Sequence, residues 1–268
     1  MTAAEEWTTA LGSWAIPEYI LAAAPESPWE FPTTLFAQRA DAAVATLSPS
    51  NRKALEALPA GGTVLDVGCG AGAASLPLTA CAGRLVGVDP SEAMLEAFRE
   101  RAEARGVAVT TVVGNWPATA ADAPDADVVV CHHVAYNVSD LADFARTLQG
   151  HARSRVVLEL TAEHPLRSLN DLWMRFHGLA RPGRPTADDA VAVLREIGIQ
   201  PGRENWQAPA LTAFARPEDL VAWTRRRLCL PPERDAEIAE AIAADLVGDA
   251  TGRVALPARP VVTLWWDR

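Results

Sequence analysis

The sequence predicts an α/β protein built on a doubly wound, mostly parallel sheet. Short apolar runs alternate with longer segments of helical periodicity through the middle of the chain. The runs are continuous rather than alternating in polarity, which is typical of parallel strands covered on both faces. The 268 residues, 49% of them hydrophobic, are enough for one large domain with a well-filled core.

The first apolar run, residues 63–67, leads into a glycine-rich turn and contains one acid, Asp66. Residues 73–81 then read as a helix. Glycine at a strand end lets backbone N–H groups approach a ligand, and the N-terminus of a following helix adds more free N–H groups. We therefore expect a binding loop between this strand and this helix, formed by glycines at three alternate positions: Gly68, Gly70 and Gly72.

Two classes of ligand use this geometry. Gly68, Gly70 and Ala73 fit the dinucleotide fingerprint, and an acid, Asp89, stands at the end of the next strand. However, a carboxylate at Asp66 would repel a pyrophosphate and attract an ammonium group. S-adenosylmethionine carries an ammonium and a sulfonium and no phosphate. The acid with its three spaced glycines therefore resembles motif I of the class I S-adenosylmethionine-dependent methyltransferases, and a nicotinamide-dependent oxidoreductase is the alternative.

The segment before the glycine turn, residues 1–58, is predicted to be largely helical. One helix is expected over residues 33–47, and Asn51 is expected to cap another that ends near Leu58. In the methyltransferases this region commonly covers the cofactor and the substrate, so the resemblance implies an N-terminal helical lid. It also makes Arg39 a candidate contact for the cofactor carboxylate.

After the glycine turn, strands and helices alternate. Right-handed crossovers place all the strand-to-helix loops at one edge of a parallel sheet, where ligands bind. The family's sheet has seven strands, the last antiparallel and next to the sixth, and the resemblance implies the same order here. We expect further strands at residues 85–89, 109–113, 127–131, 155–160, 203–206 and 261–266. We expect further helices at residues 90–104, 141–148, 164–177, 186–198, 217–228 and 233–247.

The resemblance covers about residues 60–165 and implies two parts in the chain. Residues 1–58 are the lid. Residues 59–268 are a Rossmann-like domain that binds S-adenosylmethionine, with helical insertions near 164–200 and 208–258.

The resemblance also implies roles for the loops at the strand ends. Asp89 matches the acid that binds both ribose hydroxyls, since one carboxylate can accept two hydrogen bonds. Asn115 stands where the family often has an acid and keeps an acceptor for the adenine amino group. His132 follows the fourth strand, in the loop that holds the methionine end. The other cofactor-binding candidates are Gly68, Cys69, Gly70, Pro90, Met94 and Trp116, and the candidates for the substrate pocket are Tyr136, Asn137 and His164.

His133 is the candidate catalytic residue. It would take a proton from a hydroxyl group as the methyl group arrives, and such help is worth ~10²–10⁴-fold. The alternative is that no base is used, because a sulfonium is already activated and alignment does most of the work. The Asn/Asp-Pro-Pro-aromatic motif of the amino-methylating nucleic-acid and protein-glutamine enzymes is absent. No carboxylate–histidine ligand set indicates a metal.

Composition narrows the partners. The net charge is −10, whereas a duplex or tRNA surface is usually met by a basic face. Four widely spaced cysteines predict reduced thiols in a cytoplasm, and no apolar run approaches the ~20 residues that span a bilayer. We therefore expect methyl transfer to an oxygen, nitrogen or carbon atom of a small molecule, without a nucleic-acid or membrane partner. A protein or tRNA methyltransferase and a catalytically silent, cofactor-binding regulatory subunit are the alternatives.

Overall fold

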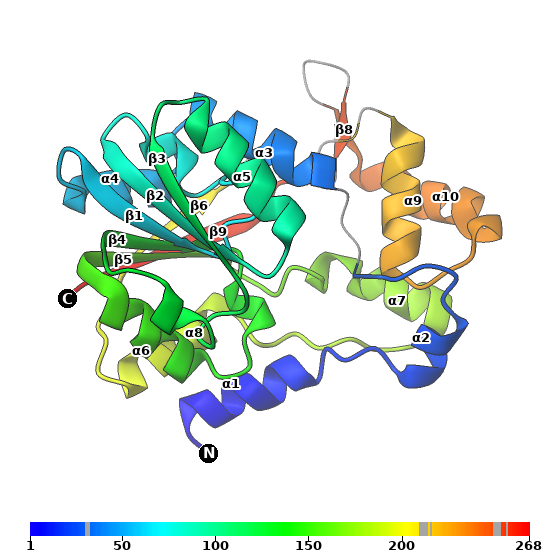
Figure 1. Ribbon diagram of the computed structural model, residues 1–268. Coiled ribbons are helices and arrows are strands. Elements are labelled where there is room, and N and C mark those ends of the chain that lie inside the picture. The colour runs from blue at the N-terminus through cyan, green and yellow to red at the C-terminus, as the bar shows by residue number, and fades with distance from the viewer. Residues whose placement is uncertain (30–32, 209–213, 215, 249–252, 256) are drawn as a thin grey trace.

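The predicted fold class is confirmed by the computed structural model, which describes residues 1–29, 33–208, 214, 216–248, 253–255 and 257–268. A doubly wound α/β core lies beside a group of helices (Figure 1). The seven-stranded sheet has the order β3-β2-β1-β4-β5-β9-β6, and β9 runs antiparallel to both of its neighbours. The strands are β1 (Gly62–Val67), β2 (Ala82–Asp89), β3 (Ala108–Val113), β4 (Ala126–His132), β5 (Ala152–Thr161), β6 (Gly202–Gln207) and β9 (Pro260–Asp267).

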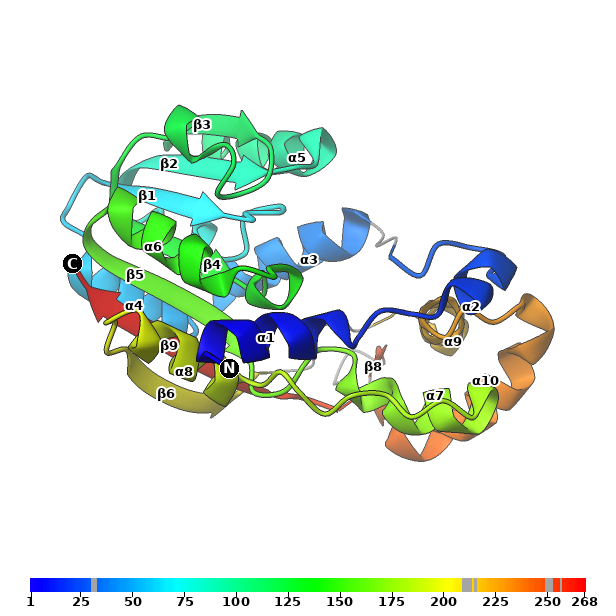
Figure 2. The same cartoon turned by 90° about the horizontal axis from the view of Figure 1, so that it is seen from below.

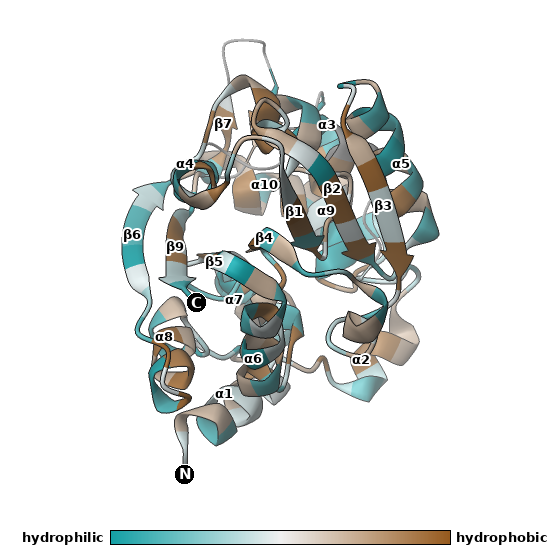
Figure 3. Cartoon of the chain, turned by 60° about the vertical axis from the view of Figure 1, so that its left-hand side comes forward, coloured by the Kyte–Doolittle hydropathy of each residue, from teal (hydrophilic) through white to brown (hydrophobic). Residues whose placement is uncertain are grey.

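Helices cover both faces of the sheet, as continuous apolar strands require. Leu65 and Val129 of the central strands point into one apolar cluster, and their neighbours Val64 and Val128 point into the other. The edge strand β6 is hydrophilic, which suits its exposed side (Figure 3). The first cluster is covered by α1 (Ala3–Gly12), α6 (Leu141–His151) and α8 (Ala187–Glu196), and the second by α3 (Thr33–Ala45), α4 (Pro49–Ala57) and α5 (Glu92–Glu103).

The expected helix over residues 73–81 is wrong. The described chain has turns there and one short 3-10 helix, η1 (Leu76–Leu78). Pro77 lacks the N–H that an α-helix needs, and β2 already begins at Ala82, so too little chain is left for a stable α-helix.

The expected N-cap of α4 is also wrong by three positions. Ser48 is the N-cap and its hydroxyl accepts from the Asn51 N–H, while the Asn51 side chain accepts from the Ser48 N–H. The Asn51 amide group then donates to the Ala74 carbonyl at 3.0 Å. This buried asparagine therefore ties α4 to the turn that follows the glycines.

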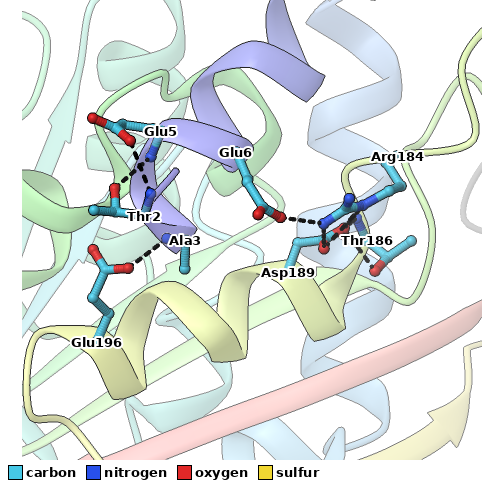
Figure 4. Close-up of polar contacts among 8 residues, drawn as sticks. All are labelled: Thr2, Ala3, Glu5, Glu6, Arg184, Thr186, Asp189 and Glu196. Carbon is cyan, nitrogen blue, oxygen red and sulfur yellow. Dashed lines mark hydrogen bonds and ion pairs between the residues drawn. The ribbon is translucent and has the colours of Figure 1, made fainter.

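Within the N-terminal segment, α1 packs against the sheet-covering helices (Figure 4). Trp7 is fully buried, and its indole N–H donates to the Val138 carbonyl at 2.8 Å. Glu6 pairs at 3.1 Å with Arg184, which also pairs with Asp189 at the start of α8. These contacts make α1 part of the layer that covers the sheet.

A separate group of helices, the cap, lies beyond the carboxyl ends of the parallel strands (Figure 2). It has its own apolar core, in which Ile20, Trp173, Leu220 and Ile238 are buried. A buried guanidinium, Arg225, reinforces it by pairing with carboxylates of two neighbouring segments. The cap therefore combines an N-terminal helix with helices from both predicted insertions. Its helices are α2 (Glu18–Ala23), α7 (Asn170–His177), α9 (Pro217–Arg227) and α10 (Asp235–Ile242).

The remaining elements are short. The described residues contain no helix with the length and apolar character needed to cross a membrane. The short strands are β7 (Val247–Gly248) and β8 (Val254–Ala255), and the other 3-10 helices are η2 (Ala120–Asp122), η3 (Ala135–Asn137), η4 (Arg167–Leu169), η5 (Pro232–Arg234) and η6 (Ala243–Asp245).

We predict that Trp7→Ala destabilises the whole protein by about 3–5 kcal/mol, because it empties a buried site that joins α1 to the sheet. Trp29 is 52% exposed, so Trp29→Ala is a matched control that should change stability by less than about 0.5 kcal/mol. Urea unfolding followed by far-ultraviolet circular dichroism measures both. Equal, small effects would mean that α1 is detachable from the core.

Candidate functional site

The glycine loop after β1 depends on left-handed backbone at all three glycines. Their φ angles are +71° at Gly68, +50° at Gly70 and +98° at Gly72, a region that side chains with a Cβ rarely adopt. A Cβ on Gly68 would also clash with the Cγ2 atom of Val134. The loop after β4 therefore lies directly on the glycine loop.

The backbone N–H groups of the glycine loop donate hydrogen bonds to other groups of the protein. Gly68 and Cys69 donate their N–H groups to the Val88 carbonyl at 2.8 and 3.1 Å, and Gly70 donates to the carboxylate of Asp89 at 3.0 Å. The expected free N–H groups of a following helix are absent, because residues 73–81 form no α-helix. A pyrophosphate needs such donors. This arrangement weighs against the dinucleotide alternative.

Asp66 is fully buried at the end of β1. One carboxylate oxygen, Oδ2, accepts from the Ser75 hydroxyl at 2.6 Å. The other, Oδ1, has no hydrogen-bond partner among the described residues. Burial, and then the negative charge of Asp89, raise the pKa of Asp66 to about 7. A buried acceptor without a donor, beside a second acid, fits a cationic hydrogen-bond donor such as an ammonium group.

Asp89 links the loop to the end of β2. Its Oδ1 accepts from the Ser91 N–H at 2.9 Å, and its Oδ2 accepts from Gly70. Each carboxylate oxygen can accept a second hydrogen bond, so capacity for two hydroxyl groups remains. Of its predicted companions, Met94 is buried in α5 and Pro90 is exposed.

The two predicted site residues that follow β3, Asn115 and Trp116, differ in burial. Asn115 is exposed, and its carbonyl accepts from the Thr119 N–H at 3.2 Å. Trp116 is buried in the cluster that α6 covers, with its ring 4.9 Å from that of His151. The structure therefore brings the Asn115 side chain to the surface and places the Trp116 indole in the core.

A buried carboxylate joins the two histidines after β4. Glu159 of β5 lies 3.0 Å from the Nε2 atom of His133 and 3.7 Å from the Nδ1 atom of His132. Burial alone would raise the pKa of Glu159, but the two imidazoles outweigh burial and hold it at about 2. Burial lowers the pKa of His132, and the charge of Glu159 opposes this shift. An ionised Glu159 requires a proton on Nε2 of His133, which leaves Nδ1 as the basic atom of that ring.

The sequence reasoning missed Glu159. It stands in the apolar run of β5, and strand pairing places it between His132 and Thr263. Ser50 of α4 contacts the Thr263 hydroxyl at 2.7 Å. The available signal was a single acid inside a buried strand, which is costly unless it is paired.

His133 itself adopts a strained backbone, with φ at +60°. Its N–H donates to the Glu159 carbonyl at 2.7 Å, so both its main chain and its ring contact the same residue. Strain of this kind persists only where the surroundings impose it, and it is common at functional sites.

The predicted pocket residues lie on the other side of the β4 loop. The Tyr136 hydroxyl donates to the Thr161 carbonyl at 2.8 Å, and its ring meets the edge of His164 at 5.2 Å. His164 also stacks on Trp14 at 3.8 Å. Burial, with nearby arginines, lowers the pKa of His164 to about 3, so its ring is neutral. Asn137 is exposed.

Helix α3 lies over the glycine loop. The Phe36 ring would be 3.7 Å from a Cβ on Gly70, and the Arg39 guanidinium lies 5.7 Å from the centre of the Phe36 ring. Within the segment before β1, α3 therefore contacts the glycine loop, and the role of this segment as a lid stays a prediction.

Sequence comparison adds a family and several relatives. Residues 64–154 match the family described as a methyltransferase domain. The ubiquinone biosynthesis O-methyltransferase of Methylobacterium sp. (strain 4-46) is 35% identical over 88 residues, which are 33% of this chain and 35% of the relative. The enzyme of the same name from Roseobacter denitrificans is 26% identical over 156 residues, 52% of this chain and 60% of the relative. The chain thus spans 35% of the length of the first of these curated relatives and 60% of the length of the second.

Solved structures share the fold at low identity. The YcgJ protein of Bacillus subtilis is 18% identical, with a TM-score of 0.52 over 82% of this chain and 97% of that one. A protein of Bacillus halodurans C-125 is 19% identical, with a TM-score of 0.53 over 82% and 99%. The fold is the class I methyltransferase fold that the sequence predicts.

We predict that Gly68→Ala destabilises the protein by about 2–4 kcal/mol. The energy cost of a left-handed backbone at alanine and the cost of the clash with Val134 are summed in this value. Gly106 has nearly the same φ, +72°, but nothing lies within 4 Å of its Cβ position, so Gly106→Ala isolates the strain of about 1 kcal/mol. Chemical denaturation of both variants measures the difference. An equal loss in both would show that the β4 loop does not press on Gly68.

We predict that Asp66→Asn removes a pH dependence of stability. In the folded protein the pKa of Asp66 is about 7, above its ordinary value of 3.8, so the folded state binds the extra proton between these values. The free energy of unfolding of the wild type should therefore fall, relative to that of Asp66→Asn, as the pH rises toward 7. Between pH 5 and pH 8 the relative loss is roughly 3 kcal/mol, at ~1.4 kcal/mol per pH unit. Urea unfolding at both pH values tests this, and a constant difference between the proteins would contradict it.

Proposed function

Taking residues 64–154 as a methyltransferase domain, we propose that the protein transfers a methyl group from S-adenosylmethionine to a hydroxyl group of a small molecule. The observation that carries the proposal is the buried Asp66, which has a raised pKa and one oxygen without a hydrogen-bond partner among the described residues, as a site for a cationic donor requires. The printed names of the curated relatives, which are O-methyltransferases, support an oxygen acceptor. The free cysteines support a cytoplasmic setting.

Different residues at the carboxyl ends of the strands bind different groups of the methyl donor. Asp66 accepts from the ammonium group, and Asp89 accepts from the ribose hydroxyls with its remaining lone pairs. Met94 supplies apolar surface beside Asp89, and Arg39 of α3 serves the carboxylate end. S-adenosylmethionine, when bound, supplies a methyl group that its sulfonium has already activated.

The histidine after β4 handles the proton of the acceptor. Nδ1 of His133 accepts the hydroxyl proton, and Glu159 fixes the ring through Nε2 and stabilises the imidazolium that results. Glu159 is a positioning residue, because it acts through His133. The low pKa of Glu159 keeps its charge in place throughout the neutral range.

Calorimetric titration with S-adenosylmethionine and S-adenosylhomocysteine tests the proposal. We predict that the wild type binds both and that Asp89→Ala weakens binding at least ~30-fold, the loss of two charge-assisted hydrogen bonds. Glu92→Ala, in the exposed first turn of α5, is the control and should bind as the wild type does. Folded wild type that binds neither compound would refute the proposal.

The base assignment predicts a specific kinetic pattern. With an acceptor found by screening phenolic metabolites for S-adenosylhomocysteine release, His133→Asn should lower kcat by ~10²–10⁴-fold. Glu159→Gln should also lower kcat and shift the pH–rate profile, while the affinity for S-adenosylmethionine stays within ~3-fold of the wild type. A parallel loss of affinity would mean that Glu159 has a structural role only.

A further inference from the structure

A cavity of about 400 Å³ opens between the sheet and the cap. It lies where β5 ends and β9 begins, and the segment that leads into α7 closes its other side. Six of the residues around it are Thr161, His164, Pro165, Ser168, Arg259 and Pro260.

Arg259 is a charged group of the cavity lining that has no carboxylate partner among the described residues. Its guanidinium donates to the Pro165 carbonyl, and among the described residues it forms no ion pair with a carboxylate. Of the two acids around the cavity, Glu163 is engaged by Arg167 at 3.0 Å, and Asp171 is exposed at the rim. A half-buried guanidinium is costly without an anion, and its planar fork matches a carboxylate or a phosphate.

Further positive charge surrounds Arg259. Arg39 of α3 and Arg227 of α9 lie close enough to repel it. Burial lowers the pKa of each to about 10, followed by repulsion from Arg259 for Arg39 and from Arg226 and then Arg259 for Arg227. Burial also lowers the pKa of Arg259 itself. Guanidinium groups from three separate segments thus lie near one another, and one of them, Arg259, lines the cavity, in a protein whose net charge is −10.

The cavity adjoins the candidate site. Thr161, at its wall, is held by the Tyr136 hydroxyl, and His164 packs against the edge of the Tyr136 ring. Tyr136 belongs to the same loop as His133. The neutral His164 adds no charge to the cavity, and Arg167 and Glu163 pair with each other, so Arg259 and the exposed Asp171 are the remaining charged groups of the lining.

We propose that this cavity binds an anionic group of the methyl acceptor, a carboxylate or a phosphate monoester, through the guanidinium of Arg259. The inference rests on the proposed function, since it names the class of acceptor for the same site. The acceptor is then a small organic anion whose hydroxyl group reaches the β4 loop while its charged end stays at Arg259.

Binding of matched probes tests the inference independently of turnover. Benzoate, phenyl phosphate and the neutral benzamide are titrated calorimetrically into the wild type in the presence of S-adenosylhomocysteine, and again in its absence. We expect at least one anion to bind ~10-fold more tightly than benzamide. Binding of benzoate alone, of phenyl phosphate alone or of both identifies the anion and supports the inference.

The variant Arg259→Gln should abolish that preference, and Arg167→Gln, in the same cavity but already paired with Glu163, should keep it within ~3-fold. Equal binding of all three probes, no binding of any, or an equal loss in both variants would overturn the inference. S-adenosylmethionine binding by Arg259→Gln is measured alongside and should match the wild type. If the wild type bound no S-adenosylmethionine, the proposed function would fail, whereas the anion result would still decide whether the cavity selects anions.

Discussion

The buried carboxylate of Asp66 is the constraint on which the binding edge depends. A carboxylate in an apolar interior is costly unless it is neutral or paired. Here it has one hydroxyl partner, Ser75, and a second acid, Asp89, close enough to oppose its ionisation. The protein alone therefore leaves this group short of a partner, and a ligand that brings a cationic donor supplies what is missing.

The surrounding backbone fixes the turn that follows Asp66. Left-handed glycines turn the chain away from β1, and the amides of Gly68 and Gly70 donate to Val88 and Asp89 of β2, which ties the loop to that strand. The β4 loop contacts the same turn through Val134, the neighbour of His133, and His133 in turn contacts Glu159. The proposed site for a cation and the proposed site for proton transfer are thus linked through the contact between the glycine loop and the β4 loop.

The sequence predicted the strands and the glycine loop well, because apolar runs and glycine spacing are local signals. It failed for residues 73–81, where helical periodicity was overridden by Pro77 and by the early start of β2. It missed Glu159, because only the register between β4 and β5 brings that acid to His132. The cap was also beyond local reasoning, since its core joins helices distant in sequence. The sequence did not single out Arg259, because its role depends on the cavity that distant segments form around it.

The most direct test of this account is the proton balance of cofactor binding. The enthalpy of S-adenosylmethionine binding is measured at pH 6 in two buffers that differ in ionisation enthalpy. With a pKa of about 7, Asp66 is mostly protonated at that pH, so pairing with the ammonium group should release roughly one proton per molecule bound. Asp66→Asn should release none. Tight binding by the wild type without proton release would contradict the central role given to Asp66.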